Sequence, residues 1–182
     1  MKKILFSVLL VTLGAFLWWA FSPLLFDKEV SDRLDPELEA RLRAQEQVDA
    51  RRNSNNNSVL EESQDNEVKV TTTVDESGNR ITGPVEITGT PGHPASGKVS
   101  LIESPAEKIV YFENYDGTNG PDLFVYLAKD LEANEYVDLG RAKGNQGDII
   151  YGVPLDVDLS EYKYVITWCK AFSELFDYAE IN

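Results

Sequence analysis

Cys169 and His93 are the residues best suited to redox or metal chemistry, and each is the only one of its type in the chain. One cysteine cannot form an intramolecular disulfide. One cysteine and one histidine are too few for a closed zinc site built from those two types, or for a blue-copper site with two histidines and a cysteine. The Cys-x-x-Cys-His sequence that attaches a c-type haem is absent. Cys169 and His93 can therefore supply only a single ligand or part of a mixed ligand set, or they form no site at all. We predict no metal site.

The surroundings of Cys169 predict a core strand. The residues from 164 to 172 are rich in β-branched and aromatic types, which pack well on a pleated surface. Alternation places Val165, Thr167 and Cys169 on one face and Lys170 on the other. Free cysteine is among the most buried residue types, and a buried thiol tends to be inert. The sequence allows two roles for Cys169: an inert side chain that packs in the core, or a redox-active thiol.

The surroundings of His93 predict a surface loop. His93 lies between Gly89 and Gly97, in a segment whose glycines and prolines favour a turn. The oxygen-bearing residues that follow between 114 and 122 resemble a calcium loop only in part. Asn119 stands where an EF-hand loop needs its glycine, and Val125 where it needs its glutamate. We interpret this second segment as a turn.

The hydrophobic pattern from residue 67 onward has a period of two, which is typical of β-strands. Short runs of this kind are separated by turns rich in glycine, proline and asparagine, without long helical patterns between them. This arrangement predicts an all-β fold, an antiparallel β-sandwich. The expected strands are 68–74, 80–88 broken at Gly83-Pro84, 98–102, 108–113, 123–128, 136–139, 148–151 and 162–170.

The N-terminus predicts a membrane anchor. Lys2 and Lys3 precede an apolar run from Ile4 to Phe26, and Trp18 and Trp19 lie where an interfacial aromatic belt is expected. The positive charges before this run predict a cytoplasmic N-terminus and a C-terminal domain outside the cytoplasm. A cleaved signal peptide is the alternative, although the residues around Trp18 and Trp19 are bulkier than those usual before a cleavage site.

Residues 27–66 predict a helical stalk followed by a polar linker. Asp35 can cap a helix whose first position is Pro36, and Glu37 adds negative charge to its first turn. The apolar stripe is thin, with Leu34, Leu38, Leu42 and Val48, so a solvated stalk is expected and dimerisation through a short coiled coil is the alternative. The chain thus divides into an anchor (1–26), a stalk and linker (27–66) and a β-sandwich domain (67–182).

The charge of the chain excludes one class of partner. Its formal net charge is −14 and it shows no basic groove. Affinity for nucleic acid comes largely from Lys and Arg that neutralise phosphates. We therefore expect no nucleic-acid binding.

Several segments between residues 89 and 176 follow one another in an order that matches a known domain family. They are Gly89, His93 and Gly97 in a Gly-x-x-x-His-x-x-x-Gly pattern, then 119–127, 136–140, 143–148, Tyr151 with Val153-Pro154, and 168–172 followed by Phe176. In this combination, residues 85–180 resemble the DM-thirteen domain, a β domain described as an electron-transfer module. The resemblance leaves out the anchor and the stalk.

This resemblance implies a DOMON-like sandwich outside the cytoplasm. It also implies that Cys169 matches the family's characteristic cysteine, proposed to act in redox as a bare thiol or as a ligand to a prosthetic group such as haem. His93 is a second candidate for cofactor binding, and no catalytic motif comes with the resemblance. We expect a membrane-anchored electron-transfer accessory module with an unidentified redox partner protein. The alternative is a non-enzymatic extracellular binding or adhesion module in which Cys169 only packs.

Overall fold

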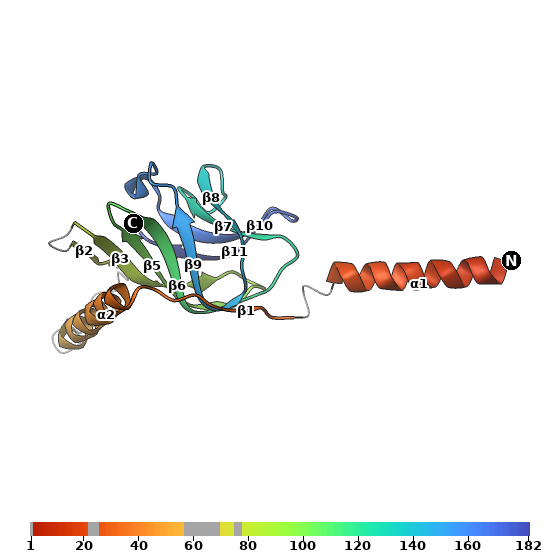
Figure 1. Ribbon diagram of the computed structural model, residues 1–182, viewed down its shortest axis with the longest axis horizontal. Coiled ribbons are helices and arrows are strands. Elements are labelled where there is room, and N and C mark those ends of the chain that lie inside the picture. Colours follow the sequence, from red (N-terminus) through yellow and green to blue (C-terminus); the bar gives the residue numbers. More distant parts are fainter. Residues whose placement is uncertain (1, 22–25, 57–69, 75–77) are drawn as a thin grey trace.

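Two β-sheets pack face to face in the computed structural model, which describes residues 2–21, 26–56, 70–74 and 78–182 (Figure 1). The first sheet has the order β1 (Glu29–Ser31), β9 (Gln146–Val153), β6 (Lys108–Gly117), β5 (Ala95–Glu103), β3 (Arg80–Glu86), β2 (Thr72–Val74). The second has the order β4 (Thr88–Gly89), β11 (Glu174–Glu180), β10 (Tyr164–Cys169), β7 (Leu123–Ala128), β8 (Tyr136–Arg141). Neighbouring strands are antiparallel except β1 and β9. The prediction of a mainly antiparallel β-sandwich is confirmed.

The main hydrophobic core lies between the two sheets. Val110 and Ile149 from the first sheet and Leu127 and Val165 from the second are all at most 1% exposed. Burying a side chain of this size contributes about 1.5–3 kcal/mol relative to leaving it exposed. The alternation detected in the sequence therefore marks the residues that join the sheets.

Two strands lie outside all the predicted ranges, and β4 was predicted only as the end of one strand with β3, although it belongs to the second sheet. β11 follows Cys169 closely, but its buried residues do not alternate because Phe176 and Asp177 are both buried. The register against β10 shifts at this point, which is a β-bulge. β1 has only three residues and pairs in parallel with β9, so it carries no periodic pattern.

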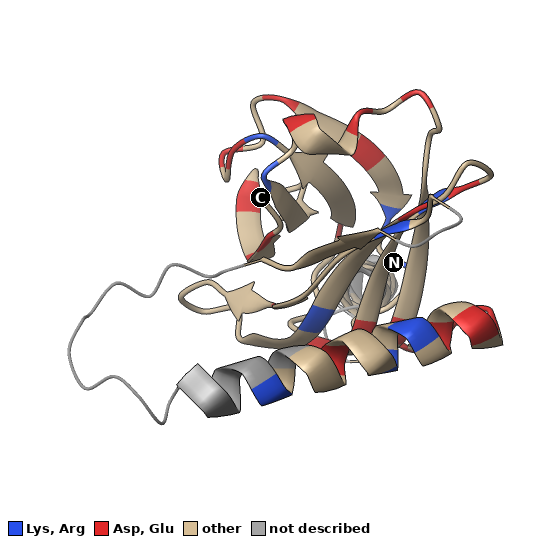
Figure 2. Cartoon of the chain, turned by 90° about the vertical axis from the view of Figure 1, so that its left-hand side faces the viewer, with Lys and Arg blue, Asp and Glu red and all other residues tan. Residues whose placement is uncertain are grey.

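The predicted stalk is a helix that packs on the sandwich. α2 (Pro36–Asn56) begins as expected, with the Glu37 backbone N–H donating to Asp35 Oδ1 at 2.9 Å. Leu34 and Leu42 are buried in one cluster with residues of the first sheet, Ile81, Ile102, Ile109 and Tyr111. Figure 2 shows α2 lying along the outer side of this sheet. The thin leucine stripe is a packing face, so the expectation that α2 is a solvated stalk is wrong.

The apolar N-terminal run forms a helix, α1 (Lys2–Phe21), which Figure 1 shows apart from the two sheets. Within the residues described, no helix has both the length and the hydrophobicity required to span a membrane. The predicted transmembrane anchor is therefore not supported by this structure.

Candidate functional site

Cys169 lies at the last position of β10, and its side chain is completely buried. It pairs directly across from Leu123, the first residue of β7. Leu123 and Phe176 are the buried side chains of its cluster, and Ala142 packs against them. The thiol thus points into the sandwich at one end of the second sheet, among apolar groups.

The bulge in β11 provides one of these neighbours. Thr167 pairs with Asp177 and Trp168 pairs with Leu175, so Phe176 is the extra residue on the bulged strand. A bulge of this type re-aims side chains by one position. As a result Phe176 packs against Cys169, while Asp177 also points into the sandwich beside Thr167.

His93 packs on Phe176 from the loop between β4 and β5. The imidazole stacks on the phenyl ring with 3.7 Å between the ring centroids and 20° between the planes. Its Nδ1 lies 3.3 Å from the Thr90 hydroxyl, which also lies within hydrogen-bond distance of the backbone oxygens of Leu175 and Phe176. The structure therefore brings His93 and Cys169 to the same end of the sandwich, as neighbours of one phenyl ring.

These two residues do not form a metal centre. Among the residues described, no three His, Cys, Asp or Glu side chains are grouped so that they could hold a metal ion. Two of the oxygen-bearing side chains between 114 and 122 have other partners: Asp116 accepts a hydrogen bond from Gln146, and Asp122 forms an ion pair with Arg141. These contacts hold neighbouring segments together. Residues 114–117 belong to β6, so the predicted turn begins only after Gly117.

A pocket of about 450 Å³ lies beside the Cys169 cluster. It is lined by the segment before β1, by the turn before β7 and by the loop after β8, namely Phe26, Asp27, Lys28, Asn119, Gly120, Leu123, Arg141, Ala142, Gly144 and Asn145. Leu123 and Ala142 belong both to this lining and to the cluster around Cys169. The thiol is therefore one layer of side chains away from the pocket.

The buried Asn145 side chain closes one side of this pocket. Its Oδ1 accepts from the Lys28 backbone N–H at 2.7 Å, and its Nδ2 donates to Asp27 Oδ1 at 2.8 Å and to the Gly117 backbone oxygen at 3.0 Å. One buried amide thus joins the N-terminal segment, the end of β6 and the start of β9.

A haem ligated by Cys169 does not fit this arrangement. The pocket has a volume in the range of cofactor sites. Its lining contains neither Cys169 nor His93, and the Leu123 and Ala142 side chains lie where a bond to the sulfur would have to pass. The site as it stands holds a shielded thiol beside a pocket of mixed polarity.

A second buried group lies at the same end of the sandwich. Tyr115 of β6 donates its hydroxyl to Asp177 Oδ2 at 2.7 Å, and the same hydroxyl lies 3.5 Å from Thr167 Oγ1. Burial raises the pKa of Asp177 to about 6, although the hydrogen bonds from Tyr115 and Thr167 lower it. Burial, and then the charge of Asp177, raise the pKa of Tyr115 well above its usual range. At neutral pH this is a phenol donating to a carboxylate.

Sequence reasoning missed Tyr115 and Asp177. The two residues are far apart in the chain and match no motif. A signal was available for Asp177, since an acid flanked by Phe176 and Tyr178 in an apolar run is a candidate for burial.

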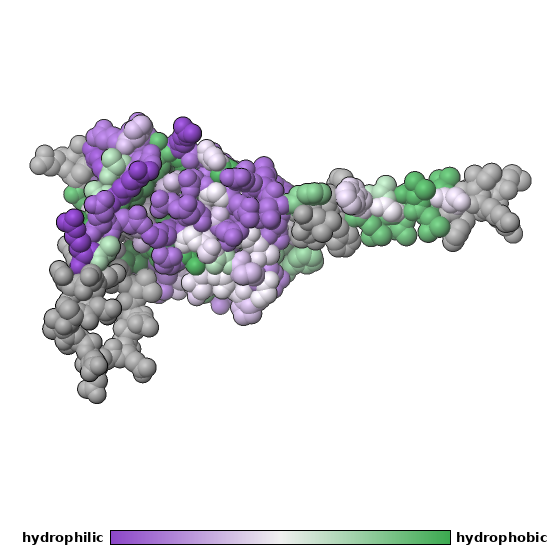
Figure 3. Space-filling view, turned by 90° about the horizontal axis from the view of Figure 1, so that it is seen from below, coloured by the Kyte–Doolittle hydropathy of each residue, from purple (hydrophilic) through white to green (hydrophobic). Residues whose placement is uncertain are grey.

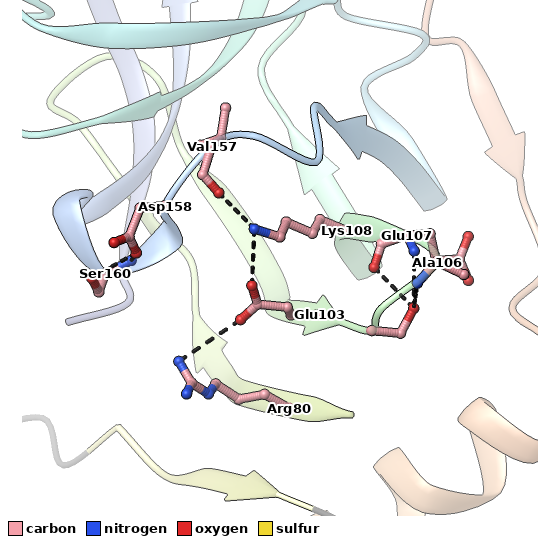
Figure 4. A network of polar contacts seen from close by, with 9 residues as sticks. Arg80, Glu103, Ala106, Glu107, Lys108, Val157, Asp158 and Ser160 are labelled. Atoms are coloured by element: carbon pink, nitrogen blue, oxygen red, sulfur yellow. Dashed lines mark hydrogen bonds and ion pairs between the residues drawn. The ribbon is translucent and has the colours of Figure 1, made fainter. Parts of the chain in front are cut away.

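The main charged network lies at the other end of β6 and β5 (Figure 4). Glu103 binds Arg80 at 3.8 Å and Lys108 at 3.0 Å, and Lys108 Nζ also donates to the Val157 backbone oxygen at 2.7 Å. Lys108 begins β6, whereas the pocket lies at the Gly117 end of that strand. This network therefore ties strand ends and does not contribute to the Cys169 site.

Comparisons with known proteins agree with the family resemblance described in the sequence analysis. A family model described as Electron transfer DM13 matches residues 87–181, just over half of the chain. The match includes His93, Tyr115, Cys169, Phe176 and Asp177. Neither the curated proteins nor the solved structures contain a match to the chain. From the extent of the family match we conclude that this chain belongs to the electron transfer DM13 family.

Proposed function

We propose that this protein is an accessory electron-transfer module whose redox group is Cys169. One observation supports the proposal most strongly. The chain belongs to a family described as electron-transfer proteins, and its single thiol lies one layer of side chains behind a pocket. A redox group of a partner protein that enters this pocket is separated from the sulfur only by Leu123 and Ala142. Electron transfer across such a layer needs no bond to the sulfur.

The pocket supports recognition of a polar partner group. Lys28 and Arg141 bring positive charge to its lining, although Arg141 is paired with Asp122 and Asp27 also lines the pocket. Asp27 and Asn119 add hydrogen-bonding groups beside the apolar Leu123 and Phe26. A few polar groups in an otherwise apolar concavity are typical of sites that orient a ligand.

We further propose that the protein is held at the cell membrane through α1, with the β-sandwich outside the cytoplasm. Lys2 and Lys3 precede the apolar run, and positive charges favour the cytoplasmic side. Figure 3 shows hydrophobic residues along α1, in contrast to the mainly hydrophilic surface of the sandwich. Leu9, Val11 and Phe16 are each more than half exposed, so they are available to a bilayer.

A second function is favoured by the burial of the thiol. Cys169 is 0% exposed in an apolar cluster, which suits a side chain that only packs. In that case the domain is a non-enzymatic extracellular binding or adhesion module. The two proposals differ in whether the thiol exchanges electrons in the folded protein.

The test compares the full-length protein with Cys169→Ser and Cys169→Ala. The electron-transfer proposal expects an outer-sphere one-electron oxidant to oxidise Cys169 in the folded wild type, and both variants to lose that oxidation while they stay folded. Ser adds an unpaired hydroxyl, at a cost of about 1–3 kcal/mol in a dry site, whereas Ala leaves a small cavity. A folded wild type that is no more readily oxidised at residue 169 than the two variants overturns the redox proposal and leaves the binding module.

The location has its own test. The intact protein is expected to pellet with membranes, to resist carbonate extraction and to lose its β-domain to protease added from outside. Recovery of a mature soluble protein without the first 20 residues supports the signal-peptide alternative.

A further inference from the structure

Tyr115 and Asp177 meet beside two separate irregularities of the backbone. In β6 the register against β9 shifts between Phe112 and Tyr115, and Asn114 between them has a positive φ of 49°. In β11 Asp177 faces inward opposite Thr167, and the bulge at Phe176 lies directly beside it. Bulges are usually retained features that re-aim a side chain. Here the irregularity in β6 aims the Tyr115 phenol inward, where it lies 2.7 Å from the Asp177 carboxylate.

This pair is not explained by stability. Tyr115 is 5% exposed and Asp177 is 2% exposed, so both polar groups have lost their hydration. Burying a carboxylate is costly, and well-packed apolar residues often stabilise such a site as well or better.

We propose that Tyr115 is a redox-active tyrosine and that Asp177 is its internal proton acceptor. An outer-sphere one-electron oxidant, such as an oxidised metal centre of a partner protein, removes one electron from the phenol. The Tyr115 O–H bond breaks and its proton moves to Asp177 Oδ2. The products are a neutral phenoxyl radical, a protonated Asp177 and the oxidant reduced by one electron. Return of an electron to Tyr115 and of the proton from Asp177 restores the starting state.

The protonation states of the pair suit this step. With a pKa of about 6, Asp177 is mostly ionised at neutral pH, and it accepts the hydrogen bond. Tyr115 keeps its proton, since its pKa is well above the usual value. The other groups that face the pair are the Thr167 hydroxyl from β10 and the phenol of Tyr151 from β9. Neither of them carries a charge at neutral pH that would compete for the proton.

The surroundings favour a persistent radical that electrons can reach. The Tyr115 ring packs edge-on against Phe112, with centroids 5.2 Å apart. A void of about 10 Å³ is lined by Tyr115 and Thr167 together with Leu123, Ala142 and Gly144, and the last three also line the large pocket. Tyr115 is thus shielded from water and lies behind the same pocket wall as Cys169. This assignment goes beyond the proposed role of Cys169 and does not depend on it.

The test is photo-oxidation of the full-length protein by ruthenium(III) tris-bipyridine, generated by a laser flash with a sacrificial electron acceptor. Electron paramagnetic resonance then detects tyrosyl radicals. We expect a long-lived neutral tyrosyl signal that Tyr115→Phe abolishes. Tyr111→Phe is the matched control, because Tyr111 is also buried in β6 but packs in the cluster beneath α2. That variant is expected to keep the signal.

Two further variants make the result independent of folding effects. Asp177→Asn keeps the shape of the side chain but is a poor proton acceptor, so the rate of radical formation is expected to fall by about 10²-fold, a usual contribution of a positioned base. Replacement of Tyr115 by 3-fluorotyrosine leaves the fold intact and should add fluorine hyperfine splitting to the signal. Cys169→Ala is expected to leave the signal unchanged, which separates this inference from the proposed function. A signal without fluorine splitting, or one formed at the same rate in Asp177→Asn, overturns the inference.

Discussion

The imidazole of His93 lies stacked on the phenyl ring of Phe176, and the same phenyl ring packs against Cys169. Phe176 is held there by the β11 bulge, and His93 by its contacts with Thr90. The two residues that the sequence marks for chemistry are thus coupled through Phe176, to which the sequence assigned no chemical role. Access to the thiol from this side depends on Phe176.

Phe176→Ala is expected to expose Cys169 in the folded protein. The lost aromatic side chain should lower the free energy of unfolding by about 3–5 kcal/mol, and the cavity should give thiol reagents a path to the sulfur. The measurement is the native labelling rate of Cys169 together with chemical denaturation. Leu175→Ala is the control, because Leu175 precedes Phe176 but packs on the outer face of the sheet. Equal labelling of the two variants would contradict the assigned position of Phe176.

Leu123→Ala is expected to open Cys169 from the pocket side. Leu123 forms part of the wall that separates the thiol from the 450 Å³ pocket, so its truncation should speed native labelling and lower the free energy of unfolding by about 2–5 kcal/mol. Leu127→Ala is the matched control from the same strand, buried in the core between the sheets. If Leu127→Ala labels as fast at equal stability, the exposure comes from global unfolding and the wall has no special role.

Asp177 is expected to make stability depend on pH. Its carboxyl pKa rises from 3.8 to about 6 on folding, so the folded protein binds this proton more tightly than the unfolded chain does. The free energy of unfolding therefore falls as the pH rises from about 4 through about 6, by about 3 kcal/mol in total at 1.4 kcal/mol per pKa unit. Asp177→Asn should remove this dependence.

Denaturation of wild type and Asp177→Asn between pH 4 and 8 measures the effect of this one group as a difference. Tyr115→Phe provides a second control. Its missing hydroxyl no longer donates to the carboxylate, so the transition should move to higher pH. A difference between wild type and Asp177→Asn that is constant with pH would show that Asp177 does not titrate in this range.

Local patterns predicted the strands that carry most of the core. β7 has the predicted bounds, and β10 lies within the predicted strand 162–170 but is shorter at both ends. Both were detectable because alternation and β-branched residues act within one strand. The same local pattern predicted that Val165 and Cys169 share a face that excludes Lys170. In the structure Val165 lies in the core between the sheets and Cys169 is buried, whereas Lys170 is exposed.

Contacts between distant segments were not predictable in this way. The bulges that aim Tyr115 and Phe176 break the alternation on which strand prediction depends. The stacking of His93 on Phe176 joins a loop to a strand near the other end of the domain. The pocket exists because the segment before β1 is bound by Asn145, and no periodicity of either segment encodes that contact.

The leucine stripe of α2 shows how a weak amphipathic pattern can be misjudged, and its variants test the packing directly. Leu42 is 8% exposed against the first sheet, whereas Val48 of the same helix is 49% exposed. Leu42→Ala should therefore lower the free energy of unfolding by at least about 2 kcal/mol, and Val48→Ala should change it by less than about 0.5 kcal/mol.

Gln45→Ala tests the polar side of the contact, because the Gln45 amide donates to the Gly83 backbone oxygen and accepts from the Thr73 hydroxyl. Its loss leaves a buried carbonyl unsatisfied and should cost about 1–3 kcal/mol. Thermal and chemical denaturation of the three variants decide the matter: equal stability of Leu42→Ala and Val48→Ala would mean that α2 stands free of the sheet in solution.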